Sequence, residues 1–91
     1  MGLTGPAQRG NRMRLLVIDG QGGGVGKSLI AAVKRLAPEQ AVIAAGTNAQ
    51  ATAAMLRAGA DLGATGESAI RYQCRRADVI AGVTGILHAN A

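Results

Sequence analysis

A glycine-rich run near the start of the chain has the residue types and spacing best suited to chemistry. It reads DGQGGGVGKSL over positions 19–29, and five glycines fall within positions 20–26. An apolar run, LLVI, precedes it, and apolar residues recur at helical spacing after it. A strand, a glycine turn and a helix in this order form a phosphate-binding device, because a helix N-terminus presents free N–H groups and partial positive charge. We therefore expect a nucleotide or another phosphate-bearing small molecule as the ligand.

The candidate site residues follow predicted strands, at the edge where their carboxyl ends meet. We expect the ligand to contact the glycine loop, the residues after the second strand and the residues after the fourth strand. The predicted cofactor-binding residues are Gly20, Gln21, Gly22, Gly23, Gly24, Val25, Gly26, Lys27, Thr47, Asn48, Thr84 and Gly85. The sequence assigns no catalytic residue and predicts no metal ligand.

The glycine run matches neither of two P-loop patterns at every position. The strict P-loop requires glycine where Gln21 stands, so that pattern fails. The variant of partition-type ATPases reads KGGVGK[ST], and residues 23–28 match it except that Gly22 replaces the first lysine. An NTPase that uses ATP and magnesium is therefore kept as an alternative function.

The loop resembles that of the short-chain dehydrogenases, which carry T-G-x-x-x-G-x-G after their first strand. Gly20, Gly24 and Gly26 have this spacing, with Asp19 at the threonine position. The resemblance implies that Gly20 makes the turn, Gly24 admits a phosphate and Gly26 lets the helix pack on the sheet. It also implies that Val25 seals the loop against the core, and that NAD or NADP is a possible cofactor.

Several residues depart from the dehydrogenase pattern. The catalytic Tyr-x-x-x-Lys is absent, since Tyr72 is followed four residues later by Arg76 on a different element. Thr47 and Asn48 stand where an acid would bind the ribose, and no arginine there can clamp a 2′-phosphate. Whether the protein is an enzyme is left open. Asp19, which replaces threonine, is expected to hold the turn by accepting backbone N–H bonds.

At closer range the chain resembles a small bacterial family of unknown function. The runs VIDGQGGGVGKSL, GTNAQATAAMLRAGADLGATGE and ADVIAGVTGILHAN carry this resemblance, which covers residues 13–91. The resemblance implies a Rossmann-like fold and no known reaction. Because the family is typically somewhat longer, it also implies that the chain ends early.

Strand and helix patterns alternate along the chain, which predicts an α/β fold. Residues 1–12 lack apolar periodicity and are expected to form a flexible tail before a nucleotide-binding domain over 13–91. Right-handed βαβ connections then predict a three-layer Rossmann-like fold with about four parallel strands in the order 3-2-1-4. We expect strands over 14–19, 41–45 and 77–81, a third strand or a loop over 60–65, and a helix beginning over 86–91 that the chain does not complete.

Composition limits the partners. Ten Lys and Arg against five Asp and Glu give a net charge of +5, but these residues are scattered and no aromatics interleave with them, so we do not expect nucleic acid. No apolar run reaches the roughly 18 residues of a membrane span, and we expect no membrane partner. The single cysteine, Cys74, excludes an internal disulfide and favours the cytoplasm.

The small predicted sheet points to an oligomer. A four-stranded half of a doubly wound fold leaves an edge strand and apolar surface to cover, which self-association would do. The sequence therefore predicts a homo-oligomer. A non-catalytic structural or regulatory subunit is a further alternative function.

Overall fold

The computed structural model describes residues 13–82 and 85–88. The predicted tail over 1–12 and the candidate Thr84 lie outside the described residues. The described elements, in chain order, are β1 (Arg14–Asp19), α2 (Gly24–Leu36), β2 (Ala41–Gly46), α3 (Ala49–Arg57), β3 (Leu62–Thr65), α4 (Glu67–Arg76), β4 (Val79–Gly82) and β5 (Gly85–His88).

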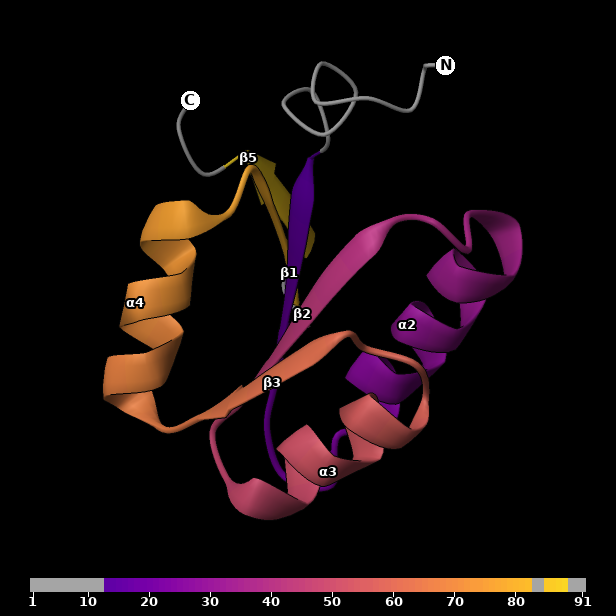
Figure 1. The fold of residues 1–91 in the computed structure, drawn as a ribbon. Helices are drawn as coiled ribbons and strands as arrows, with labels where there is room; N and C mark the ends of the chain where they lie inside the picture. The colour runs from indigo at the N-terminus through magenta and orange to yellow at the C-terminus, as the bar shows by residue number, and fades with distance from the viewer. Residues whose placement is uncertain (1–12, 83–84, 89–91) are drawn as a thin grey trace.

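A five-stranded sheet forms the middle layer of the fold. Its order is β3-β2-β1-β4-β5, and the first four of these strands are parallel. Helices α2 and α3 cover one face of the sheet, and α4 covers the other (Figure 1). The predicted α/β class, the three Rossmann-like layers and the strand order 3-2-1-4 are confirmed.

The end of the described chain differs from the prediction. Residues 85–88 form β5, which pairs antiparallel with β4, so a helix beginning at residue 86 is wrong. The pairing places Ile86 opposite Ala81 and Gly85 opposite Gly82. A strand is favoured here because it pairs the N–H and C=O groups of β4 that would otherwise lie at an open edge.

Continuous apolar runs in the central strands supply two cores. Alternate side chains of a strand point to opposite faces, so Leu16 packs on the α4 side and Val17 packs on the α2 and α3 side. Both side chains are fully buried, because helices cover both faces of β1. On the α4 side, the partly buried Ile70 and Cys74 lie against the core.

An ion pair joins the C-terminal part of α2 to the segments around β2 and β3. The Lys34 ammonium lies 2.7 Å from Oδ2 of Asp61 and donates to the Gln40 carbonyl at 2.6 Å. The same carboxylate oxygen accepts the Val42 N–H at 2.9 Å. The Lys34 hydrogen bond, followed by the Val42 hydrogen bond, lowers the pKa of Asp61 below its ordinary value. These contacts fix the end of the glycine-loop helix opposite the site.

We predict that Asp61→Asn destabilises the protein near neutral pH but not in strong acid. The folded state lowers the pKa of Asp61, so its contribution is present above the unfolded pKa of about 3.9 and is lost as pH falls through the folded value. Because the Asp61 side chain is 55% exposed, solvent screening limits the loss to about 1 kcal/mol or less. Urea unfolding of both proteins at about pH 7 and about pH 2.5 measures this. An equal stability difference at both pH values would contradict it.

Candidate functional site

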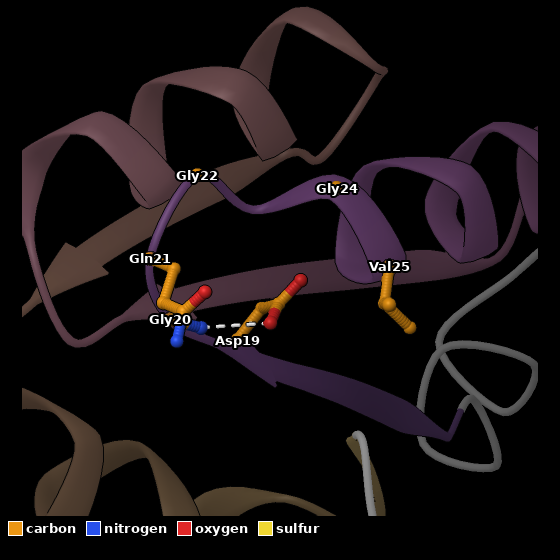
Figure 2. A pocket seen from close by; sticks show the side chains of 6 residues that line it. All are labelled: Asp19, Gly20, Gln21, Gly22, Gly24 and Val25. Atoms are coloured by element: carbon orange, nitrogen blue, oxygen red, sulfur yellow. Dashed lines mark hydrogen bonds between the residues drawn. The ribbon is translucent and has the colours of Figure 1, made fainter.

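A hollow opens at the carboxyl end of β1, where the chain turns into α2. Its volume is about 460 Å³. It is lined by Asp19, Gly20, Gln21, Gly22, Gly24 and Val25 (Figure 2). From β1 the chain leads through α2 to β2 on one side, while β4 pairs with β1 on the other. Ligands of doubly wound sheets bind at such a switch point, outside the carboxyl ends of the strands.

The loop that borders the hollow is a tight turn followed directly by a helix. The Gly23 N–H donates to the Gly20 carbonyl at 2.9 Å, and the Lys27 N–H donates to the Gly23 carbonyl at 2.8 Å. Gly23 has φ 76° and Gln21 has φ 51°. This left-handed backbone conformation is rare for residues other than glycine. The helix therefore begins at Gly24, three residues before Lys27.

The Asp19 carboxylate ties the two ends of this loop together. Its Oδ1 accepts the Gly20 N–H at 2.7 Å, and its Oδ2 accepts the Gly26 N–H at 2.5 Å (Figure 2 shows the first of these bonds). Only 8% of the residue is exposed. The expectation that Asp19 holds the turn by accepting backbone bonds is confirmed. Asp19 also lines the hollow, although it was not among the predicted site residues. Its position at the end of the first strand could have indicated this from the sequence.

Two backbone donors remain at the start of α2. The first N–H groups of a helix have no acceptor within the helix, and Asp19 accepts only that of Gly26, the third helical residue. The N–H groups of Gly24 and Val25 stand at the first two helical positions, and both residues line the hollow. They are the groups best placed to bind an anionic oxygen.

Packing and backbone conformation account for three of the five loop glycines. A Cβ on Gly26 would lie 2.6 Å from Sδ of Met55 on α3 and 3.0 Å from Cβ of Asp19 at the end of β1, so Gly26 allows α2 to approach a neighbouring helix as well as the expected sheet. A Cβ on Gly23 would lie 2.9 Å from the Ala51 carbonyl oxygen, and its φ is also positive. A Cβ on Gly20 would lie 2.7 Å from the hydroxyl oxygen of Thr47.

The other two loop glycines have no such requirement. A Cβ on Gly22 or on Gly24 would meet nothing within 4 Å, and neither residue has positive φ. Both residues are exposed and line the hollow. Their lack of a side chain leaves open space rather than serving the fold.

The expected role of Val25 in the core is wrong. Its side chain is 56% exposed and lines the hollow. A helix turns by about 100° per residue, and the buried positions of α2 are Gly26 and Ile30, so Val25 points elsewhere. Lys27 is also exposed, at the fourth position of α2, and is not among the residues that line the hollow.

The residues after the second and fourth strands have different parts in the structure. Asn48 caps α3, because its Oδ1 accepts the Ala51 N–H at 2.8 Å. Thr47 is exposed beside the loop, and its N–H donates to the Asp19 carbonyl at 3.0 Å. Gly85 is the first residue of β5, opposite Gly82, rather than part of a loop leading to a helix. The structure thus brings Thr47 to the glycine loop and uses the Asn48 side chain to begin a helix.

Comparisons with known proteins place this sequence in a family. Residues 14–91 match the family described as "Domain of unknown function (DUF3842)". The chain belongs to the DUF3842 family. No curated protein and no solved structure matches it. Membership agrees with the predicted resemblance to a family of unknown function, and it supplies no reaction.

A second hollow of the DUF3842 domain lies on α4. Its volume is about 310 Å³, and it is lined by Ser68, Arg71, Tyr72 and Arg75. The Arg76 guanidinium lies 5.5 Å from the centroid of the Tyr72 ring. These arginines are therefore grouped on one helix rather than scattered. Glu67 at the start of α4 and Arg75 and Arg76 in its last turn also complement the helix dipole, which explains the grouping without a ligand.

One further observation bears on the surroundings of the domain. Within residues 13–82 and 85–88, none of the helices has the length and apolar character needed to cross a membrane.

We predict opposite stability effects for two alanine substitutions in the loop of the DUF3842 domain. Gly26→Ala should cost about 1–2 kcal/mol, because overpacking against Met55 and Asp19 exceeds the gain in helix propensity. Gly24→Ala should be neutral or slightly stabilising, since its Cβ enters open space. Urea denaturation of both variants compares them with the parent. Equal destabilisation would show that the loop is packed differently.

Proposed function

We propose that this domain binds a nucleotide or dinucleotide, with a phosphate at the glycine loop over 20–26. The supporting observation is the division among the loop glycines. Gly20, Gly23 and Gly26 satisfy packing or backbone conformation, whereas Gly22 and Gly24 leave space that the fold does not use. Glycine costs conformational entropy on folding, so a ligand in the hollow is the simplest reason for keeping these two.

The chemistry of the hollow suits a phosphate oxygen. The N–H groups of Gly24 and Val25 point from the start of α2, where the helix dipole adds partial positive charge. Lys27 lies one turn further along and can add a flexible positive charge from the surface. These groups bind and orient a phosphate; no side chain among them is a candidate nucleophile or general base.

NAD or NADP remains a possible cofactor, but the ribose end has little to recognise it. Thr47 provides an exposed hydroxyl after β2. The Asn48 side chain is occupied by the cap of α3. Neither an acid for the 2′-hydroxyl nor an arginine for a 2′-phosphate stands there, so we propose weak discrimination between the two cofactors. We also propose a cytoplasmic location, because the single cysteine of the sequence cannot form an internal disulfide.

The P-loop alternative with ATP and magnesium has less support. A P-loop wraps phosphate with several N–H groups of an extended glycine loop before its lysine. Here Gly24 and the next two residues are already helical, and the Lys27 N–H donates to the Gly23 carbonyl. Of the first residues of α2, only Gly24 and Val25 keep a backbone donor for an anion.

Self-association is supported by a separate observation on α2. Val25, Leu29, Ala32 and Leu36 follow each other at spacings of four, three and four residues, which places them along one stripe of the helix. Leu36 is 80% exposed and Val25 is 56% exposed. Leu29 packs partly against the core, so the exposed Val25 and Leu36 are the parts of this stripe that would contact a second copy of the chain, which gives the structural or regulatory subunit a physical basis.

We predict that Gly24→Val abolishes nucleotide binding and leaves the fold intact. The valine side chain would enter the hollow without a clash, because no atom lies within 4 Å of the Cβ position. It would displace a phosphate from the Gly24 and Val25 N–H groups. Losing two charged hydrogen bonds of about 1.5–3 kcal/mol each weakens affinity at least roughly a hundredfold. Calorimetric titration with NAD, NADP, AMP and ATP, alongside thermal unfolding, measures both properties.

Ala31→Val is the matched control for this substitution. Ala31 is exposed on the same helix and is not among the residues lining the hollow, so affinity should be unchanged. A well-folded Gly24→Val protein that binds as tightly as the parent would show that the loop is not the site. Failure of the parent to bind any of the four nucleotides would refute the proposed function.

We predict that Leu36→Glu reduces self-association without unfolding the domain. The Leu36 side chain is already mostly exposed, so the charge is solvated in a monomer but buried at an interface. Light scattering over a range of concentrations compares the variant with the parent. A parent protein that stays monomeric at high concentration would exclude this second function.

A further inference from the structure

The Asp19 carboxylate lies beside the first turn of α2. The partial positive charge of a helix, which would attract a phosphate, is greatest at this end. The carboxylate lines the hollow and is only 8% exposed. Both of its oxygens accept backbone N–H groups, from Gly20 and from Gly26 in the first turn of α2. The helix has no acidic residue of its own in that turn, so Asp19 is the negative charge that α2 receives from outside.

This carboxylate changes the charge that a ligand meets. A helix N-terminus carries about half a positive charge, and a full negative charge on Asp19 more than offsets it. Lys27 is exposed to solvent, which screens its contribution. The hollow thus keeps the hydrogen-bond donors of Gly24 and Val25, but little net positive charge lies close to them.

Phosphate groups differ in how well they tolerate such a site. A phosphate monoester carries a charge of about −1.5 to −2 near neutral pH, because its second pKa is about 6. A phosphate esterified on both sides has lost that second proton site and carries a single negative charge. Each additional charge a few ångströms from a buried carboxylate is repelled, whereas the hydrogen bonds to two N–H groups are available to both kinds.

We propose that Asp19 determines which phosphates the glycine loop accepts. The loop binds a phosphate substituted on both sides, such as one of the two phosphates in the internal diphosphate of a dinucleotide, each of which carries one negative charge, in preference to a terminal phosphate monoester. This inference rests on the proposed function and goes beyond it by naming the charge of the ligand group and the residue that selects it.

The test compares two ligands that differ in this charge and otherwise by one methyl group. AMP carries a monoester, and adenosine 5′-methyl phosphate carries the corresponding diester. Chemical-shift titration of the Gly24 and Val25 amides with each ligand measures affinities into the millimolar range. We expect the parent protein to bind the methyl ester roughly tenfold or more tightly than AMP, the size expected for one extra charge at about 6 Å in a partly solvated site.

Replacing Asp19 should remove the preference by strengthening the binding of AMP. In Asp19→Asn the ratio of the two affinities should fall to within about twofold. Glu39→Gln is the matched control, because it makes the same change in net charge in the exposed turn beyond the other end of α2; its ratio should equal that of the parent. Asp19→Ser, which keeps a small hydrogen-bond acceptor, serves as a second variant if the asparagine disturbs the fold.

The outcomes separate this inference from the function on which it rests. A parent protein that binds both esters equally would overturn the inference and leave nucleotide binding standing, whatever the variants do. A preference that survives in a folded Asp19 variant, with both affinities shifted alike, would assign Asp19 a purely structural part and also overturn it. Binding of neither ester by the parent protein would count against phosphate binding itself.

Discussion

The buried Asp19 carboxylate is the constraint on which the site depends. The Asp19 side chain connects the end of β1 to the first turn of α2 by accepting the N–H groups of Gly20 and Gly26. The backbone carbonyl of Asp19 accepts the Thr47 N–H. Burying a charge is costly unless it is hydrogen-bonded. Two N–H bonds and the helix dipole compensate that cost. The strand, the turn, the helix and the entry to α3 are therefore held in one arrangement, and this arrangement shapes the hollow.

Small residues allow the helices to lie close to the sheet without aromatic packing. Gly26 faces Met55 of α3, and Gly46 at the end of β2 lies against Thr52. The Thr52 hydroxyl accepts the Thr65 hydroxyl hydrogen bond at 2.8 Å, so this buried polar group is satisfied inside the core. Interiors are packed as tightly as crystals, and at these contacts even one added methyl group would have to displace a neighbour. The close packing keeps the loop in place at the border of the hollow.

The loop combines features that separately point in different directions. Free N–H groups at a helix N-terminus favour an anion, and Gly22 and Gly24 leave room for one. Asp19 brings a negative charge to the same place. On the proposed function, a site that offers donors without much net positive charge would recognise a phosphate mainly by hydrogen bonds and shape, which favours a ligand of modest charge. Membership of the DUF3842 family gives no reaction, so these local properties are the available guide to the ligand.

Much of the fold could be predicted from the sequence, because strand order follows from alternating apolar runs and right-handed crossovers. The glycine run between an apolar strand and a helical pattern also predicts the strand-to-helix turn. Asn48 was also predictable as a helix cap, since its side chain acts on its own neighbours. Only the tertiary structure decided the rest. Whether residues 85–88 become a strand depends on β4 being held in the sheet by β1, which is distant in the sequence, so that the other edge of β4 is free to pair with them. Likewise, the packing of α2 decides that Val25 is exposed, because burial depends on which side of a helix faces its neighbours and not on the residue alone.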